Sequence, residues 1–139
     1  MTPYKTKPMI IQTKAIDFGL IHRAGWGLIS EMGTGKTMAA LYWALRLKLK
    51  CVAVLGRPDD LDTWEEQIQL HTTARYVNIC RPSSTRERLK LVKPVDGVTF
   101  YLLTYDSVKR MRKALDRMPW DGVIADEMAE LRHWSSAKT

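Results

Sequence analysis

Residues 30–37 read Ser-Glu-Met-Gly-Thr-Gly-Lys-Thr, a pattern whose residue types and spacing are suited to holding phosphate groups. Gly33 and Gly35 have no side chain, so their backbone N–H groups can turn toward phosphate oxygens. Lys36 would place an ammonium group near the β- and γ-phosphates of a nucleotide, and Thr37 would offer a hydroxyl to Mg²⁺. A helix that begins here would add the positive end of its dipole.

The first position of this loop departs from the usual pattern. In G-x-x-x-x-G-K-[ST], the first residue is Gly, whereas this chain has Ser30. The alternative interpretation is an ordinary Gly-rich turn before a helix, with Lys36 exposed. A short apolar strand expected over 27–29 and a helix expected over 37–49 favour the phosphate loop, because they provide the strand and helix that such a loop connects.

A pair of carboxylates follows about ninety residues later, where Val123-Ile124-Ala125 leads into Asp126-Glu127. A carboxylate at the end of a strand can hold Mg²⁺, directly or through water, and the next one can polarise an attacking water. We assign these roles to Asp126 and Glu127, respectively. The alternative is a helix amino terminus that carries electrostatically favourable acids.

Short apolar runs alternate with helical patterns along the chain, which predicts an α/β fold: a mostly parallel sheet with helices on both faces. We expect strands over 27–29, 51–55, 76–79, 98–103 and 122–125. We expect helices over 13–24, 37–49, 62–70, 84–92 and 106–115. The length of 139 residues indicates a single domain, 1–139. In such sheets ligands bind at the carboxyl ends of the strands, where both motifs are expected.

The net charge of +7 is suited to a polyanionic partner. Basic residues gather in 81–93 and 109–117, and each run can also be read as a solvated helix face. Cys51 and Cys80 lack metal-site spacing and are expected to be buried thiols. With no signal peptide or membrane span in the sequence, we expect a soluble, intracellular protein of the cytoplasm without membrane partners.

The sequences of the two motifs resemble the corresponding motifs of superfamily-two helicases of the Swi/Snf type. Their phosphate loop usually reads Asp-Glu-Met-Gly-Leu-Gly-Lys-Thr, so Ser30 falls on a position that is commonly Asp. Their acidic box reads Asp-Glu-Ala-His and is followed by an apolar-basic step, which Leu131-Arg132 matches. Met128 replaces Ala and Ala129 replaces His, and the missing His at position 129 puts in doubt the usual coupling of this box to a second motor lobe.

Three further segments carry the resemblance. Arg57-Pro58 with Trp64-Glu65 resembles the motif after the family's second strand. The segment 103–107, Leu-Thr-Tyr-Asp-Ser, resembles its Thr-Thr-Tyr-Glu-x-Leu segment. Gln12 resembles the upstream Gln that reads adenine, although a lone Gln at a helix start is more often a surface residue.

The resemblance implies a RecA-like P-loop domain that binds ATP and Mg²⁺ and belongs to a DNA-dependent ATPase that moves on duplex DNA. Its implied catalytic residues are Lys36 and Glu127, and its implied metal ligands are Thr37 and Asp126. The implied nucleotide-binding residues are Gln12, Glu31, Met32, Gly33, Thr34, Gly35, Lys36 and Thr37. The implied DNA-binding residues, which would contact the backbone, are Arg57, Pro58, Thr104, Tyr105 and Lys109.

The family pairs two RecA-like lobes, and the resemblance covers only the first. We expect either a fragment or a naturally short product, of the compact kind found in bacteria or phages, whose second lobe or partner chain would supply arginine fingers. Hydrolysis by this lobe alone should be weak. The main alternative is a free-standing, non-enzymatic module that binds DNA or docks on a motor. A small P-loop kinase is disfavoured because no basic lid follows the acidic pair.

Overall fold

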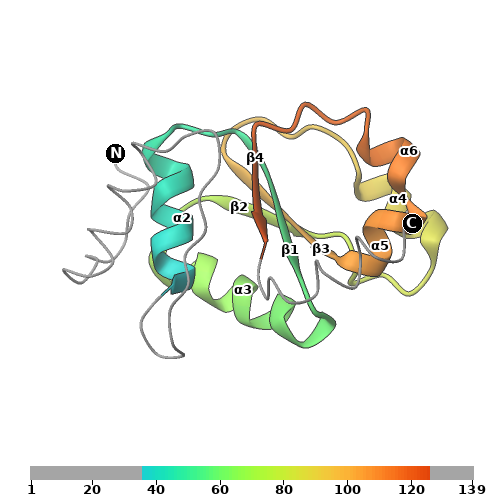
Figure 1. Ribbon diagram of the computed structural model, residues 1–139, viewed down its shortest axis with the longest axis horizontal. Coiled ribbons are helices and arrows are strands. Elements are labelled where there is room, and N and C mark those ends of the chain that lie inside the picture. Colours follow the sequence, from blue (N-terminus) through green and yellow to red (C-terminus); the bar gives the residue numbers. More distant parts are fainter. Residues whose placement is uncertain (1–35, 126–139) are drawn as a thin grey trace, which may run out of the picture.

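A parallel β-sheet with helices on both faces organises the protein in the computed structural model, which describes residues 36–125 (Figure 1). The described strands are β1 (Cys51–Gly56), β2 (Arg75–Asn78), β3 (Thr99–Thr104) and β4 (Gly122–Ala125). The described helices are α2 (Lys36–Arg46), α3 (Pro58–His71), α4 (Thr85–Leu91), α5 (Tyr105–Arg110) and α6 (Arg112–Leu115). The predicted α/β fold is confirmed, while the helix expected over 13–24 and the strand expected over 27–29 lie outside the described residues.

The described strands are arranged in the order β2-β3-β1-β4, and every neighbouring pair is parallel. In this register Val54 of β1 pairs with Leu102 of β3 on one side and with Ile124 of β4 on the other. Parallel pairing requires helical crossovers, and these cover both faces of the sheet. The carboxyl ends of all these strands therefore meet at one edge, where the chain can place polar side chains.

Alternate residues of the central strands point into two separate cores. On one face the strand residues Val52, Val54, Phe100 and Leu102 pack against α2 and against Leu61, Trp64 and Ile68 of α3. On the other face Cys51, Ala53, Tyr101 and Leu103 pack against Met111, Leu115 and Met118. This double burial explains why β1 and β3 read as continuous apolar runs rather than as alternating ones.

Helix α2 ends at Arg46, three residues before the predicted end. The N–H of Leu49 donates to the carbonyl of Ala44 at 3.1 Å, and that of Lys48 donates to Leu45 at 3.1 Å. Lys48 adopts a φ of 58°, the left-handed conformation that closes a helix in this hydrogen-bonding pattern. The reversal turns the chain directly into β1.

Helix α3 begins at Pro58, four residues before the predicted start at 62. Proline is favoured in the first turn because its fixed φ suits a helix and its missing N–H needs no partner there. Asp59 and Asp60 add negative charge beside the amino terminus. Asp62 and Glu65 have the spacing of a capping box, but they lie inside the helix rather than at its start, and their carboxylates contact Arg81.

Helices α4 and α5 begin at side-chain caps. Ser84 caps α4 by accepting a hydrogen bond from the N–H of Glu87 at 3.2 Å. Thr104 caps α5 by accepting from the N–H of Ser107 at 3.1 Å. The single helix expected over 106–115 is divided at Met111, whose backbone leaves the helical region at φ −112° and ψ 21°.

Candidate functional site

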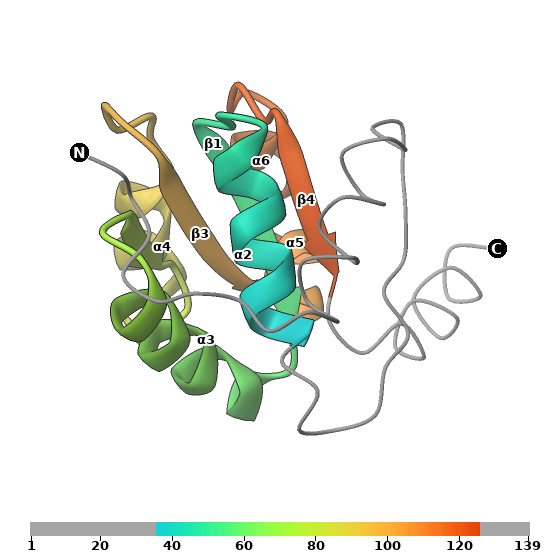
Figure 2. The ribbon, with the colours of Figure 1, turned by 90° about the vertical axis from the view of Figure 1, so that its left-hand side faces the viewer.

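The amino end of α2 and the carboxyl end of β4 lie toward the same edge of the sheet (Figure 2). At its other end α2 turns into β1, and the Leu49 side chain there lies against Gly122, where β4 begins. Helix α2 therefore runs opposite to the strands, and Lys36, its first residue, lies at their carboxyl edge. Ala125 is the last residue of β4 and directly precedes the acidic pair.

Most residues predicted to bind nucleotide and metal lie outside the described residues. These are Gln12, Glu31, Met32, Gly33, Thr34, Gly35, Asp126 and Glu127. Thr37 is half-buried in the first turn of α2. Among residues 36–125, no group of three or more His, Cys, Asp or Glu side chains is placed to hold a metal ion.

A cleft of about 360 Å³ opens where β1, β2 and β3 end. It is lined by Pro58, Leu61, Asp62, Asn78, Cys80, Arg81, Arg88, Thr104, Asp106, Ser107 and Arg110. These residues come from the start of α3, from α4 and α5, and from the ends of β2 and β3 and the segment after β2. Three guanidinium groups with two aspartates, an amide and two hydroxyls make the cleft polar and, on balance, positively charged.

The predicted DNA-binding residues are distributed around this cleft. Pro58 and Thr104 line it. Arg57 is exposed immediately before α3, where its Nε lies 3.4 Å from Oδ2 of Asp60. Lys109 is exposed on α5, next to Arg110 of the lining. Tyr105 is only 9% exposed, so its side chain belongs to the interior rather than to the surface that a partner would contact.

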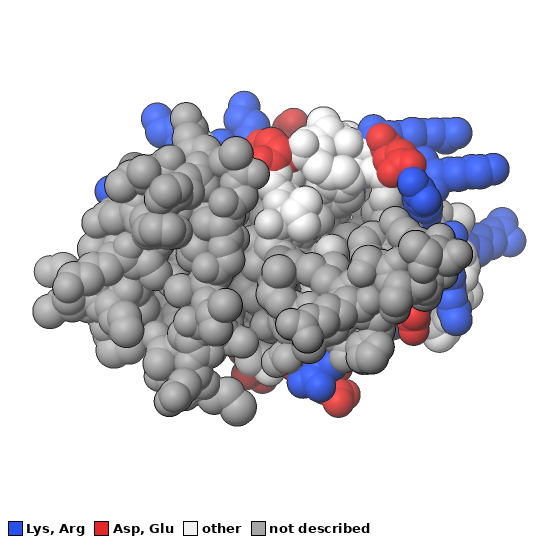
Figure 3. All heavy atoms as spheres, in the orientation of Figure 1, with Lys and Arg blue, Asp and Glu red and all other residues white. Residues whose placement is uncertain are grey.

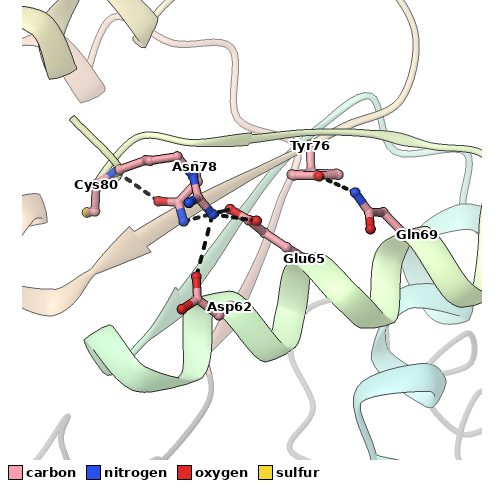
Figure 4. Close-up of polar contacts among 7 residues, drawn as sticks. Asp62, Glu65, Gln69, Tyr76, Asn78 and Cys80 are labelled. Carbon is pink, nitrogen blue, oxygen red and sulfur yellow. Dashed lines mark hydrogen bonds and ion pairs between the residues drawn. The ribbon is translucent and has the colours of Figure 1, made fainter.

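Arg81 joins the segment after β2 to helix α3. Its partners Asp62 and Glu65 on α3 are labelled in Figure 4, together with Asn78 at the end of β2. Its guanidinium donates to both carboxylate oxygens of Glu65, at 2.5 and 2.6 Å, and reaches Asp62 at 3.5 Å. The amide of Asn78 also donates to Glu65, at 2.8 Å, and its own oxygen accepts from the N–H of Cys80 at 3.0 Å. This network fixes one wall of the cleft.

The electrostatics of the network follow from these contacts. Burial alone would raise the pKa of Glu65, but hydrogen bonds from Arg81 and Asn78 and the charge of Arg81 outweigh it, so this pKa lies below its ordinary value. The same partnership, led by the hydrogen bond to Glu65, raises the pKa of Arg81. The guanidinium of Arg81 is thus already paired with carboxylates.

Arg88 and Arg110 are differently placed. Arg88 on α4 is half-buried, and its Nε donates to the carbonyl of Pro82 at 2.5 Å, which leaves the outer nitrogens for a ligand. Arg110 ends α5, and its side chain makes no hydrogen bond or ion pair with any other described residue. Sequence reasoning missed both: they lie in recognised basic runs, but no local pattern showed which members of each run would turn toward the cleft.

No helix within the described part of the chain has the length and apolar character needed to cross a membrane. No protein-family model matches the sequence, and no curated protein matches it.

Among solved structures, the chain is similar to the SWI2/SNF2 ATPase core of Sulfolobus solfataricus in complex with dsDNA. The TM-score is 0.74 at 20% sequence identity, and the match covers 96% of this chain and 28% of that chain. This chain therefore spans less than a third of the length of the protein it matches. The expected RecA-like α/β fold is confirmed, and it is the fold of the matching part of a SWI2/SNF2 ATPase core.

Proposed function

We propose that this chain is the ATP-binding lobe of a DNA-dependent motor of the Swi/Snf type. The observation that carries the proposal is the convergence of Lys36, at the start of α2, and Ala125, at the end of β4, on one edge of a parallel sheet. A phosphate-loop sequence precedes the first and an acidic pair follows the second. Ligands of open α/β sheets bind at this edge.

In this function the loop 31–37 wraps the phosphates, with Lys36 neutralising charge on the β- and γ-phosphates. Gln12 contacts adenine, and Glu127 orients the attacking water. The hydroxyl of Thr37 and the carboxylate of Asp126 are oxygen donors of the kind Mg²⁺ prefers, so they fit this ion as ligands. Bound Mg²⁺ would neutralise charge that develops on the phosphates.

Turnover by residues 1–139 alone is expected to be slow. An arginine finger contributes about 10³–10⁵ in rate in related nucleotide hydrolases. In the proposed motor this group comes from the second RecA-like lobe or from another chain. We therefore expect ATP binding without appreciable hydrolysis. Robust DNA-stimulated hydrolysis by residues 1–139 would contradict the proposal that the arginine finger comes from a second lobe or another chain.

DNA is proposed to bind across the cleft at the ends of β1, β2 and β3. Arg57, Arg88 and Arg110 offer guanidinium groups, and the start of α5 offers Thr104. Among residues 36–125, no aromatic ring on which bases could stack lines the cleft, so the contacts are expected to be with backbone phosphates. The solved SWI2/SNF2 core was obtained with dsDNA, which supports duplex DNA as the partner.

Nucleotide binding is tested with Lys36→Ala, measured by titration calorimetry with ATP and Mg²⁺. Lys50→Ala is the matched control, because Lys50 is exposed at the opposite edge of the sheet, where β1 begins. We expect at least a tenfold loss of affinity for Lys36→Ala only. Equal affinity for ATP in the two variants would refute the nucleotide site.

DNA binding is tested by fluorescence anisotropy with a labelled duplex. Affinity should fall steeply between ~50 and ~200 mM salt, because each phosphate contact releases counterions. Arg110→Gln should lower the slope of log K against log salt by about one unit, whereas Lys50→Gln should not. A salt-independent affinity would refute the phosphate contacts.

The alternative is a non-enzymatic DNA-binding or docking module, which would use the cleft alone: among residues 36–125, the lining of the cleft includes no residue of α2. The Lys36→Ala variant separates the two functions. If ATP does not bind to the wild type while duplex DNA does, the module is correct and the motor lobe is not.

A further inference from the structure

Two basic runs that are distant in sequence form one continuous surface on the outer side of the sheet. Helices α4, α5 and α6 lie together on one side of the molecule, and Figure 3 shows Lys and Arg side chains projecting from that side. Leu91 and Val92, at the end of α4, pack into the same core as Met111 and Leu115 of the α5–α6 segment. The two runs are therefore held side by side by their apolar residues.

We call the charged side of this unit the basic layer. It consists of Arg86, Arg88, Lys90, Lys93, Lys109, Arg110, Arg112, Lys113 and Arg117. The segments 85–93 and 105–117 contain these nine cations and three acids, which amounts to nearly all of the chain's net charge of +7. All but Arg88 are exposed.

Internal ion pairs do not neutralise the basic layer. Within the described residues, the acids of segments 85–93 and 105–117 make two ion pairs with the layer: Glu87 with Lys90 at 3.1 Å and Asp116 with Arg112 at 3.9 Å. Every side chain in these pairs is more than half exposed, and such pairs are weak and screened by salt. The remaining cations repel one another, a cost that a polyanionic partner would remove.

Buried contacts hold the layer in place beneath the charges. The hydroxyl of Tyr101 in β3 donates to the carbonyl of Lys93 after α4, at 2.7 Å. The ring of Trp120 packs edge-on against Tyr101 at 5.4 Å, and its Nε1 donates to the carbonyl of Leu115 in α6 at 2.7 Å. One aromatic pair thus anchors the ends of both basic segments to the sheet.

The basic layer is continuous with the cleft, since Arg88 and Arg110 belong to both. It has little apolar surface: Leu89, 41% exposed, is the one large apolar side chain exposed within 85–93 and 105–117. A membrane surface needs an apolar face beside the charges, whereas a phosphate backbone needs only cations in a row.

We infer that the basic layer is a second contact surface for a nucleic-acid backbone, which extends the DNA path from the cleft over α4 and α6. This inference rests on the proposed function only for the contact at the cleft. Apart from Lys109, its cations are not among the residues that the sequence resemblance assigned to DNA binding. The contact is independent of base sequence, because the exposed cations contact phosphates, which carry no sequence information.

The test compares two triple variants of the full chain. The layer variant is Arg112→Gln, Lys113→Gln and Arg117→Gln, all exposed on or just after α6. The control is Lys48→Gln, Lys50→Gln and Arg75→Gln, all exposed near the amino edge of the sheet. Both remove three positive charges, so they change the net charge equally. Circular dichroism and urea unfolding confirm that both variants are folded.

Binding to a ~30-base-pair duplex is measured from ~50 to ~200 mM salt. The layer variant should lower the slope of log K against log salt by about 2–3 units, because each lost phosphate contact removes about 0.9. The control should change it by less than about one unit. Equal losses in the two variants would overturn the inference, because bulk charge alone would then explain the binding.

Two further arms separate this inference from the proposed function. If Arg110→Gln weakens DNA binding and the layer variant does not, the cleft contact stands and the basic layer is only a solvated surface. If phosphatidylserine-containing vesicles bind the wild type and duplex DNA does not, both the inference and the DNA contact of the proposed function are wrong.

Discussion

Helix α3 and the basic layer cover opposite faces of the same sheet, and they differ in both charge and packing. Residues 58–71 contain five acids and no Lys or Arg, whereas the basic layer has nine cations. Helix α3 buries Leu61, Trp64 and Ile68, while α4 has no buried residue at all. One helix is part of the core, and the other is mainly a support for charged side chains.

This difference indicates a division of roles between the two faces. A helix held by three buried side chains can be altered on its exposed side without losing its position. A helix with none is held by contacts near its end, as α4 is through Leu91, which packs partly into the core, and through the Tyr101 contact with Lys93 just after it. Surfaces that bind partners are often placed on such weakly buried elements, since their residues are free of packing demands.

The largest effect is expected from Trp64→Ala, which removes the most voluminous side chain of α3 from the core. Trp64 is 3% exposed, and truncation of a buried Trp costs about 3–5 kcal/mol. Urea unfolding followed by circular dichroism measures the loss. Leu89→Ala on α4, where the side chain is 41% exposed, should change stability by less than about 0.5 kcal/mol.

The contrast between a core helix α3 and a surface helix α4 would be refuted if Trp64→Ala and Leu89→Ala lost similar amounts of stability. That result would mean that α4 contributes to the core as much as α3 does, and the basic layer could no longer be regarded as a surface element.

An intermediate effect is expected from Glu65→Gln, which removes the charge that connects acidic α3 to Arg81. The pKa of Glu65 in the folded protein lies below its ordinary value of 4.5. A depressed carboxylate pKa stabilises the fold above the unfolded value, and this stability is lost as pH falls through the folded pKa. Wild-type stability should therefore decrease below about pH 4.5, and Glu65→Gln should flatten that decrease.

Glu66→Gln is the matched control for this pH profile, because Glu66 is exposed on the same helix. Urea midpoints between ~pH 3 and ~pH 7 provide the readout. A pH profile unchanged by Glu65→Gln but altered by Glu66→Gln would show that the ion pair with Arg81 is not formed in solution. Glu65→Gln should also raise DNA affinity slightly, since it releases Arg81 toward the cleft.

The sequence was sufficient for the fold because each described element has a local cause. Apolar runs such as Cys51–Leu55 predicted the buried strands, and the alternation of these runs with helical patterns predicted the helices between them. The observed helix boundaries differ from the predicted ones where a single residue sets the backbone conformation. Helix α3 begins early at Pro58, and α2 ends early because Lys48 adopts a left-handed conformation that Lys seldom adopts. Such shifts depend on a few hydrogen bonds rather than on periodicity.

The candidate site was less predictable, because it depends on contacts between distant segments. Phosphate-binding residues can be read from their spacing, and their roles remain predictions for the residues outside 36–125. Arg88 and Arg110 come from different helices and meet only through the strand order, so neither run alone indicates a shared cleft. Tyr105 shows the reverse: its neighbours resemble a DNA-contact segment, yet its side chain is buried.

The smallest effect on global stability, and the most specific for the comparison, is expected from Ser84→Ala. Loss of an amino-terminal cap costs a helix about 1 kcal/mol. Because α4 has no buried residue, that cost should appear as local opening of α4 rather than as global unfolding. We expect the urea midpoint to stay nearly constant while amide hydrogen exchange within α4 becomes several-fold faster. Ser83→Ala, an exposed neighbour outside the cap, should leave both unchanged. If Ser84→Ala instead lowers global stability by the full cost of the cap, α4 unfolds together with the core, and the two faces of the sheet are energetically one unit.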